Sequence, residues 1–299
     1  MPSGPCDALR RQGYQFFSPP SSAALKPCMW CKRALAGGDM CYKHQFYGIA
    51  SHRCVQMTPT LRCNQRCLFC WRSFEHEVTA EEECPPEVIL AGIHRLQKKA
   101  LAGYNAVLDN TVTDEKWKEA LDPKHVAISL SGEPTLYSRL PELIHLFTTN
   151  WYTTFLVSNG TNPAMLARCR AYQTYVSLDA PDELTYKKVC RPLADTWEHV
   201  NESLRQLGGR RSAVRITLVA GLNDVAPENY AAILQESGAQ FTEVKGYMYL
   251  GSSRNRLQRK NMPEHDAVRA FAEKIAAESD YTIRDENRLS RVVCLEREG

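Results

Sequence analysis

The stretch HVAISLSGEPTLY (residues 125–137) decides the fold of this 299-residue chain. It begins with an apolar, β-branched run that is typical of a buried strand, and it changes at Ser-Gly-Glu-Pro into a turn. A segment with a helical pattern follows at residues 138–149. The stretch therefore predicts a strand, a polar turn and a helix, which together form the repeating unit of a parallel sheet.

The same pattern recurs along the chain. Strand candidates lie at 55–59, 125–131, 152–159, 174–180, 213–220 and 241–249. Helical candidates lie at 86–102, 138–149, 163–171, 195–207, 227–237 and 264–278. Strands that alternate with helices predict an α/β fold, and their number favours a partial (β/α)6 TIM-type barrel over a full eight-stranded one. In such a fold, polar residues at the carboxyl ends of the strands are the expected site of chemistry.

The alternating pattern divides the chain into three parts. Residues 1–54 hold five cysteines and show no clean periodicity, so we expect a cysteine-rich N-terminal extension. Residues 55–262 form the predicted barrel. Residues 263–299 are expected to form a C-terminal helix and a tail that pack on the barrel.

The composition, with 43% hydrophobic and 24% charged residues, is ordinary for a globular protein. No apolar stretch approaches the length of a membrane span, and the N-terminus lacks the apolar core of a signal peptide. We therefore expect a cytoplasmic protein without a membrane partner. Twelve cysteines are many for such a protein, and eight of them lie in the first 70 residues. Because disulfides are disfavoured in the cytoplasm, this distribution favours metal ligation or catalysis.

Three of these cysteines stand in CNQRCLFC (63–70), with the spacing C-x3-C-x2-C. A structural zinc site normally closes with four ligands. Three thiolates can instead bind three irons of a [4Fe–4S] cluster, which leaves the fourth iron open to a small molecule. The alternatives are three incidental cysteines and a zinc site that borrows a ligand from elsewhere.

This spacing just after the first strand, with an aromatic residue before the last cysteine, resembles the radical S-adenosylmethionine (SAM) superfamily. The resemblance implies that Cys63, Cys67 and Cys70 hold a [4Fe–4S] cluster whose open iron binds SAM, which is then cleaved to a 5′-deoxyadenosyl radical. It also implies SAM contacts by Phe69, Gly132, Glu133, Pro134, Ser158, Asn159, Ser177 and Asp179. Among these, Glu133 would receive the SAM amino group, because a carboxylate is the right partner for an ammonium ion.

A second set of cysteines, Cys28, Cys41 and Cys54, has the spacing C-x12-C-x12-C. The chain from about residue 25 to 265 resembles the 4-demethylwyosine synthases, and the stretches that carry this resemblance are MCYKHQFYGIASHRC (40–54), GEPTLY (132–137), SNGT (158–161), SLDAP (177–181) and YMYLGSSRNRL (247–257). The resemblance implies that the second set holds another [4Fe–4S] cluster with an open iron. Cys31 offers an alternative, because it could complete a four-thiolate zinc site with the other three.

Lys43, two residues after Cys41, is by the same resemblance a catalytic lysine that forms a Schiff base with pyruvate. This chemistry requires a neutral amine, although the pKa of a free lysine is about 10.4. Burial, or neighbouring cations such as Arg53, would favour the neutral form.

The resemblance to this family implies a radical SAM lyase that forms carbon–carbon bonds. It would condense N1-methylguanosine 37 of phenylalanine tRNA with pyruvate, giving the 4-demethylwyosine of wybutosine biosynthesis. Some members of the family carry a fused flavodoxin-like domain that supplies electrons, and this chain resembles the shorter archaeal form. We therefore expect an external electron donor, and we expect the protein to be a monomer.

Basic residues are concentrated at the N-terminal end. Residues 1–73 carry ten basic residues against two acidic ones, and such a local positive field suits an RNA partner. The basic segment GSSRNRLQRK (251–260) predicts phosphate contacts by Arg254, Arg256 and Lys260. Candidates for stacking on a flipped-out base are Tyr247, Tyr249 and Trp71, although such aromatic residues more often belong to the core.

Three other functions stay open on the sequence alone. The chain could be a radical SAM enzyme with an auxiliary cluster that acts on a peptide or small molecule. It could be a zinc-stabilised RNA-binding protein without enzymatic activity. It could also act on the same tRNA with a carbon donor other than pyruvate.

Overall fold

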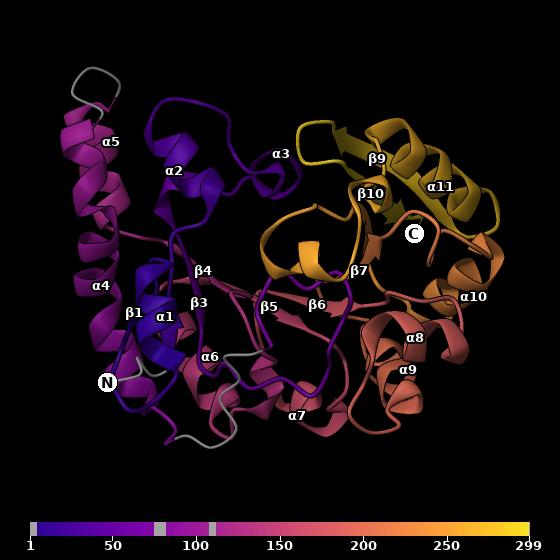
Figure 1. The fold of residues 1–299 in the computed structure, drawn as a ribbon, viewed down its shortest axis with the longest axis horizontal. Coiled ribbons are helices and arrows are strands. Elements are labelled where there is room, and N and C mark those ends of the chain that lie inside the picture. Colours follow the sequence, from indigo (N-terminus) through magenta and orange to yellow (C-terminus); the bar gives the residue numbers. More distant parts are fainter. Residues whose placement is uncertain (1–4, 75–81, 108–111, 299) are drawn as a thin grey trace. The chain divides into compact units, whose positions relative to one another are not determined.

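The computed structural model describes residues 5–74, 82–107 and 112–298 (Figure 1). These residues form two compact units. The first unit contains the described residues of Met1–Arg62, Glu75–Leu156 and Arg168–Tyr172, and the second contains those of Cys63–Phe74, Val157–Ala167 and Gln173–Gly299. Each unit is described separately below.

Parallel strands form the centre of the first unit. Strand β3 (Cys54–Thr58) pairs with β4 (His125–Ile128), and β4 pairs with β5 (Thr153–Ser158), whose last two residues belong to the second unit. Two short strands, β1 (Gln15–Phe16) and β2 (Ala24–Leu25), form a hairpin, and β2 is antiparallel to β3. All three parallel strands were predicted from their apolar runs.

Helices α4 (Pro86–Val107), α5 (Asp114–Leu121) and α6 (Leu140–Thr149) complete the first unit, and α4 contacts both of the others. Helix α6 shows why these segments become helical. Its buried residues, Leu140, Leu143, Ile144 and Phe147, follow the spacing of one helix face, and a proline stands in its first turn. Helix α5 was not predicted, although Thr113 caps it by accepting a hydrogen bond from the amide of Lys116 (3.2 Å).

The predicted cysteine-rich extension contains regular structure of its own. Its short helices are α1 (Pro5–Arg11), α2 (Met29–Leu35), α3 (Tyr42–Tyr47) and the 3₁₀ helix η1 (Ser51–Arg53). Helices of six or seven residues hold too few turns for a helical period to stand out in the sequence, which explains why none of them was predicted.

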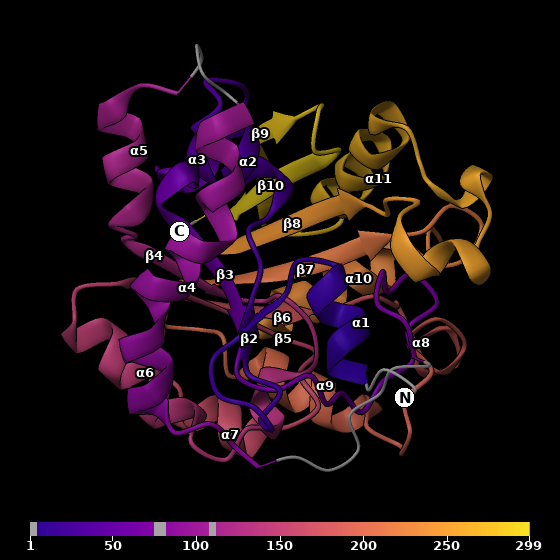
Figure 2. The ribbon, with the colours of Figure 1, turned by 60° about the vertical axis from the view of Figure 1, so that its left-hand side comes forward.

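Three parallel strands also form the centre of the second unit, namely β6 (Gln173–Ser177), β7 (Ser212–Leu218) and β8 (Phe241–Gly246). After the predicted helix, the expected C-terminal tail forms two further strands. Strand β10 (Val292–Arg297) is antiparallel to β8, and β9 (Tyr281–Asn287) is antiparallel to β10 (Figure 2).

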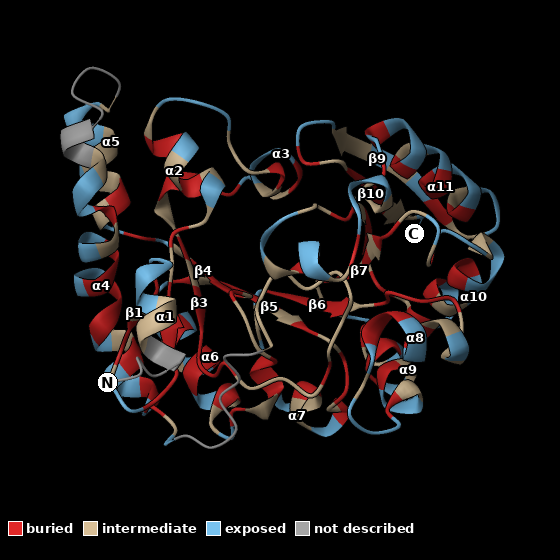
Figure 3. Ribbon diagram, in the orientation of Figure 1, coloured by how far each residue is buried: buried red, intermediate tan, exposed pale blue. Residues whose placement is uncertain are grey.

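Four of the described α-helices belong wholly to the second unit, namely α8 (Glu183–Cys190), α9 (Trp197–Arg205), α10 (Pro227–Ser237) and α11 (His265–Ala277). A further helix, α7 (Pro163–Arg168), also belongs to this unit except for its last residue. Helix α11 contacts β8, β9 and β10, and α10 contacts both α9 and α11. Burial follows this arrangement, since β6, β7, β8 and β10 are mostly buried and the helices alternate buried and exposed residues (Figure 3).

All six predicted strands and all six predicted helices are therefore confirmed, and so is the α/β fold class. Strands β3 to β8 follow one another in chain order with helices between them, in agreement with a partial (β/α)6 TIM-type barrel. Among the described residues, no helix combines the length and the apolar character that a membrane crossing requires.

Candidate functional site

The loop of residues 63–74, called the cysteine loop below, follows β3 in the chain and belongs to the second unit. Its backbone is bonded to the C-terminal end of α8. The amide of Arg66 donates to the carbonyl of Cys190 (3.1 Å), and the amide of Leu68 donates to the carbonyl of Val189 (2.9 Å). These bonds fix the backbone between Cys63 and Cys70, although the loop has no regular secondary structure.

Asn64 joins the cysteine loop to the turn that follows β5. Its side-chain amide donates to Thr161 Oγ1 (2.8 Å), and its Oδ1 accepts from the side-chain amide of Asn159 (3.0 Å). Within that turn, Ser158 Oγ accepts from the amide of Gly160 (3.0 Å). The predicted SAM contacts Ser158 and Asn159 are therefore held against the residue next to Cys63.

Cys67 lies in a dense polar environment. Its thiol is 3.3 Å from Gln65 Oε1, and the side-chain amide of Gln65 donates to the hydroxyl of Tyr186 (2.8 Å). A hydrogen bond with the buried thiol of Cys190 raises the pKa of Cys67 well above its usual range, and burial adds to the rise. Cys190 is thus a neighbour of the predicted cluster ligand.

Arg256 binds the cysteine loop from the far end of the sequence. Its guanidinium donates to the carbonyls of Leu68 (3.1 Å) and Cys70, and it lies 4.2 Å from the ring centre of Phe74. Burial lowers the pKa of Arg256, although the group remains positively charged. This side chain, predicted to bind RNA, is instead bonded to the protein's own backbone.

Phe69 packs on an apolar cluster of the second unit that contains Val219, Tyr247 and Leu257. Tyr247 is only 1% exposed, and its hydroxyl is 2.8 Å from Ser253 Oγ, so it belongs to the core and offers no surface for stacking on a base. Tyr249 is half-buried, with the guanidinium of Arg254 at 5.4 Å from its ring centre. The carbonyl of Trp71 accepts a hydrogen bond from Ser252 (2.9 Å).

Ser177 and Asp179 stand at the carboxyl end of β6. Ser177 is half-buried, whereas Asp179 is 7% exposed and accepts a hydrogen bond from the amide of Thr217 (2.7 Å). Burial raises the pKa of Asp179 to about 6. Asn223, which the sequence did not single out, is fully buried and donates to the carbonyl of Asp179 (2.8 Å).

The Gly132-Glu133-Pro134 turn belongs to the first unit and follows β4. Gly132 has a φ of +79°, and a Cβ at this position would overlap the backbone of residues 60–62, which lead into the cysteine loop. Glu133 is 2% exposed, and its Oε1 accepts from the amide (3.0 Å) and hydroxyl (2.7 Å) of Thr135. The predicted carboxylate is thus fixed in orientation.

Cys28, Cys41 and Cys54 each stand at the beginning of an element of the first unit. Cys28 precedes α2, and its sulfur accepts from the amide of Cys31 (3.3 Å), whereas Cys41 precedes α3 and Cys54 begins β3. Helix N-termini favour thiolates, because the amides there carry partial positive charge. Burial raises the pKa of Cys54 well above its usual range, and Cys28 and Cys41 are close enough to contribute.

Cys31 has a different environment from the other three. It is fully buried in an apolar cluster with Leu35, Leu101 and Ala120, and its thiol is 3.9 Å from the carbonyl of His52. Burial raises its pKa far above the usual range. Cys28, Cys41 and Cys54 are half-buried, so Cys31 is the least accessible of the four thiols.

Lys43 projects from α3 with its Nζ 4.8 Å from the ring centre of Phe155, and it is half-buried. It is close enough to Cys28 and Cys54 to favour their thiolate forms, against the larger opposing effect of burial. Arg53, expected to act as a cationic neighbour of the lysine, forms ion pairs with Asp122 (2.9 Å) and Glu119 (3.5 Å).

The two sets of thiols suit iron–sulfur chemistry. None of the described cysteines forms a disulfide. In the part of the chain that the structure describes, no three His, Cys, Asp or Glu side chains converge on one point as ligands of a single ion do. In an iron–sulfur cluster each cysteine binds a different iron, so its ligands need no common point. The three thiols of the cysteine loop are a donor set that such a cluster takes.

The other predicted RNA contacts lie in short 3₁₀ helices of the second unit. Arg254 is in η3 (Gly251–Asn255), and its Nε donates to the carbonyl of Tyr249 (3.2 Å). Lys260 is in η4 (Arg259–Asn261) and is exposed. Both side chains thus lie on the surface of this unit, unlike Arg256.

Comparison with known proteins identifies the class of enzyme. The family described as the radical SAM superfamily matches residues 57–233, and the family described as wyosine base formation matches residues 236–297. The S-adenosyl-L-methionine-dependent tRNA 4-demethylwyosine synthase of Pyrococcus abyssi is 42% identical over the whole of this chain and 90% of that relative. The protein of the same name from Methanocaldococcus jannaschii is 38% identical, over 97% of this chain and 95% of the relative.

Solved structures agree with these relatives. A structure of TYW1 with a lysine–pyruvate adduct bound has a TM-score of 0.90 and 37% identity, and covers 99% of this chain and 96% of that chain. A crystal structure of archaeal TYW1 has a TM-score of 0.81 and 34% identity, with the same coverage.

An α/β fold with a C-x3-C-x2-C loop after its first parallel strand defines a radical SAM enzyme, which uses SAM and an iron–sulfur cluster. More particularly, this chain belongs to the tRNA 4-demethylwyosine synthases, tRNA-modifying enzymes of wyosine biosynthesis.

Proposed function

We propose that this enzyme condenses N1-methylguanosine 37 of phenylalanine tRNA with pyruvate to form 4-demethylwyosine. The observation that carries the proposal is the position of Lys43, which lies beside Cys28 and Cys54 in the first unit. A related TYW1 has been solved with a lysine–pyruvate adduct bound, which supports a lysine of this kind as the site of pyruvate.

In this proposal, Cys63, Cys67 and Cys70 hold a [4Fe–4S] cluster with one open iron. When bound, this cluster supplies one electron to SAM, which yields a 5′-deoxyadenosyl radical. The chain's own residues orient SAM: Glu133 receives its amino group, and the other contacts are made by Phe69, Gly132, Pro134, Ser158, Asn159, Ser177 and Asp179. The fixed orientations of Glu133 and Asn159 support these roles, because a preformed site loses little freedom on binding.

Cys28, Cys41 and Cys54 are proposed to hold a second [4Fe–4S] cluster, also with an open iron. The complete burial of Cys31, beside the half-buried Cys28, Cys41 and Cys54, supports three ligands rather than four.

Lys43 is proposed to attack the ketone carbon of pyruvate and to hold it as a Schiff base. Its ammonium must first lose a proton, and the half-buried position of the side chain favours that loss. The N1-methyl group would lose one hydrogen atom to the 5′-deoxyadenosyl radical, which becomes 5′-deoxyadenosine, and its carbon would then bond to the ketone-derived carbon of the pyruvate unit. The bond to the carboxylate carbon would break, so that this carbon leaves as carbon dioxide and one electron passes to the external electron carrier. Two pyruvate carbons stay in the product, and ring closure releases Lys43 as the free amine. Holding both reactants in one site makes their encounter intramolecular.

The remaining assignments belong to the same proposal. Arg254 and Lys260 contact tRNA phosphates, whereas the bonds of Arg256 to the cysteine loop favour a positioning role. A separate protein donates electrons, and the enzyme acts as a cytoplasmic monomer. Residues 1–54 form the extension that carries the second cluster, residues 55–262 form the catalytic barrel, and residues 263–299 cover it.

Mass spectrometry of nucleosides tests the proposal directly. Phenylalanine tRNA that carries N1-methylguanosine would be incubated anaerobically with the cluster-loaded enzyme, SAM, a reductant and carbon-labelled pyruvate. We expect a new nucleoside with two pyruvate carbons. SAM cleavage without a new nucleoside would instead favour a peptide or small-molecule substrate. A new nucleoside without the label would indicate another carbon donor.

A further inference from the structure

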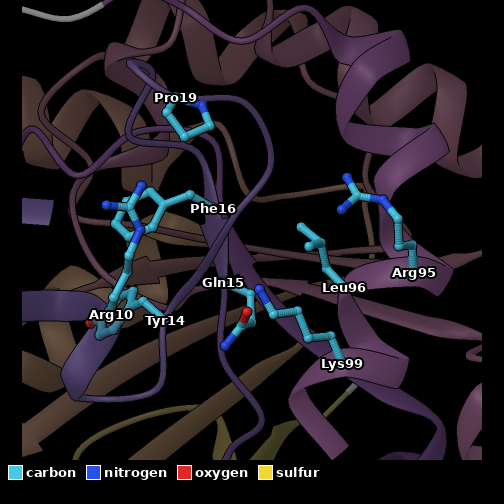
Figure 4. Close-up of a pocket in the computed structure, with 8 residues that line it drawn as sticks. All are labelled: Arg10, Tyr14, Gln15, Phe16, Pro19, Arg95, Leu96 and Lys99. Atoms are coloured by element: carbon cyan, nitrogen blue, oxygen red, sulfur yellow. The ribbon is translucent and has the colours of Figure 1, made fainter. Parts of the chain in front are cut away.

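A basic pocket lies in the first unit, among α1, the segment around β1 and the middle of α4 (Figure 4). Its volume is about 400 Å³. The pocket contains none of the cysteines or SAM contacts assigned above. It is large enough for one phosphate with its ribose, since small-molecule pockets begin at roughly 300 Å³.

Three cationic side chains from two helices line this pocket. Arg95 and Lys99 are exposed residues one helical turn apart on α4, and Arg10 comes from the last turn of α1. Figure 4 shows the α4 pair across the pocket from Arg10. Arg10 forms an ion pair with Asp7 (2.7 Å), whereas Arg95 and Lys99 have no ion pair among the described residues. The pocket therefore carries a positive charge that the protein only partly neutralises.

The aromatic residues of the pocket hold the cations rather than offer a stacking surface. Phe16 is 8% exposed, and the guanidinium of Arg10 lies 5.2 Å from its ring centre. Tyr14 is 1% exposed, and Lys26 Nζ lies 5.2 Å from its ring centre. Because these rings are buried and in contact with cations, a base would find no free ring on which to stack. The lining instead suits an anionic oxygen group.

Close packing holds the two sides of the pocket together. The segment that contains β1 contacts α4, and Gly92 of α4 lies against the ring of Phe17. A Cβ at residue 92 would overlap that ring. Gly92 thus allows the segment of Tyr14 and Phe16 to approach α4, one turn before Arg95.

We propose that this pocket binds a backbone phosphate of the tRNA substrate. The inference rests on the proposed function only in its use of tRNA, which is a polyanion. Phosphate contacts dominate the affinity of proteins for nucleic acids, and arginine and lysine are the residues that make them. Three converging cations over an apolar base give such a contact a fixed place, which a scattered set of surface lysines lacks.

The test measures binding of labelled phenylalanine tRNA to the cluster-loaded enzyme by fluorescence anisotropy at several salt concentrations. The pocket variant is Arg95→Ala/Lys99→Ala. Its matched control, Lys98→Ala/Lys118→Ala, removes two charges from exposed positions on α4 and α5 that do not line the pocket. Alanine is a strong helix former, and circular dichroism checks that each variant is folded.

We expect the pocket variant to bind tRNA about tenfold more weakly than the wild type near physiological salt, and the slope of log K against log salt to fall by about 1.5. The control should change both quantities much less. Equal losses of tRNA affinity in the two double variants would rule out the pocket as a phosphate site while leaving the proposed function in place. Absence of tRNA binding by the wild type would overturn both. If alanine at residue 95 or 99 disturbs the fold, Arg95→Gln/Lys99→Gln gives the same comparison.

Discussion

Lys43 must lose a proton before it can attack a carbonyl carbon. Some of its neighbours favour the protonated ammonium form and others favour the neutral amine. The ring of Phe155, 4.8 Å from Nζ, stabilises the ammonium form, whereas partial burial favours the neutral amine. In the proposed function, pyruvate would bring a carboxylate next to this amine. Lys43 would then combine an anion-binding role with a nucleophilic one, and the two roles can be separated by substitution.

Lys43→Arg keeps the positive charge but provides no amine that forms a stable Schiff base. We expect product formation to fall to background, while SAM is still cleaved to 5′-deoxyadenosine. Cys67→Ala should abolish SAM cleavage itself, because it removes a proposed cluster ligand. Borohydride reduction in the presence of labelled pyruvate should label the wild type but not Lys43→Arg. Product formed by the arginine variant at the wild-type rate would rule out the Schiff base.

Asp179 gives a pH dependence with a definite sign. Its pKa of about 6 in the folded chain lies above the unfolded value, so the folded state retains a proton that the unfolded state has lost. Its contribution to stability is therefore full below about pH 4 and declines as the pH rises through 6. Asp179→Asn keeps an oxygen that accepts from Thr217. From pH 7.5 to 5.5, denaturant unfolding should show the wild type gaining about 1 kcal/mol relative to the variant. A constant difference between them would contradict the buried, proton-retaining carboxyl.

Arg256→Gln tests whether this residue positions the cysteine loop. The variant loses charged hydrogen bonds to two loop carbonyls and the contact with Phe74. We expect a chelator to remove the first cluster about tenfold faster, as judged by its visible absorbance, since such bonds contribute about 1.5 kcal/mol or more each. Arg254→Gln is the matched control, because Arg254 bonds to Tyr249 and not to the loop. Weaker tRNA binding by Arg256→Gln with unchanged cluster loss would instead favour the RNA contact predicted from sequence.

At the scale of elements, the turns after the strands decide how closely the functional segments approach. The turn after β4 packs closely against the backbone of residues 60–62, and the amide of Glu133 donates to the carbonyl of Arg62 (2.7 Å). The turn after β5 is joined to Asn64. In each unit, therefore, a predicted SAM-contact turn is bonded to the chain next to the first cysteine of the loop.

Gly132→Ala and Gly209→Ala form a matched pair for measuring the cost of this approach. Both glycines have positive φ (+79° and +72°), but a Cβ meets backbone only at residue 132 and open space at residue 209. We expect Gly209→Ala to reduce the free energy of unfolding by about 1 kcal/mol. Gly132→Ala should reduce it by about 3 kcal/mol or more, because the backbone must also move. Equal reductions in urea unfolding would show that the turn can move away at little cost.

The elements that the sequence predicted share a physical character. Strands β3 to β8 are apolar runs buried on both faces, and such runs are distinctive over a few residues. Strand β9 reads YTIRDEN and is mostly exposed or half-buried, so its polar sequence resembles a loop. The strand is stabilised by its pairing with β10. Such pairing cannot be predicted from the sequence of either segment alone.

The candidate site was predictable only where spacing carried the signal. The C-x3-C-x2-C set and the Gly-Glu-Pro turn stood out because their residues are close together and follow a predicted strand, whereas the second cysteine set rested on the family resemblance. Cys190 and Asn223 were missed because they meet Cys67 and Asp179 through the fold. Arg256 was read as a surface charge, since charge alone does not reveal that the guanidinium bonds to its own backbone.

At the scale of the whole molecule, strand pairing and apolar packing hold most of the chain, whereas individual hydrogen bonds hold the cysteine loop and short helices carry the second cysteine set. Strands β7 and β8 pair over six consecutive residues, but the cysteine loop has no regular secondary structure. The two kinds of region should therefore differ in how far they rely on bound clusters.

Removal of the clusters by a chelator is expected to loosen the enzyme locally. Hydrogen exchange measured by mass spectrometry should speed up in residues 28–54 and 63–74, because cluster binding contributes stability only where its ligands are. Peptides from β7 and β8 should keep their protection, and they act as the internal control. Uniformly faster exchange throughout the chain would mean that the clusters support the whole fold.

The contact of Arg256 with Cys70 also sets an order of events during synthesis. The two residues are 186 positions apart, and a ribosome that adds about 5–20 residues per second reaches the arginine roughly 10–40 s after the cysteine. The three thiols therefore emerge well before the side chain that shapes their loop. A nascent chain therefore lacks this support for the loop until nearly the entire protein is translated, and a cluster loaded before that point would be lost more readily.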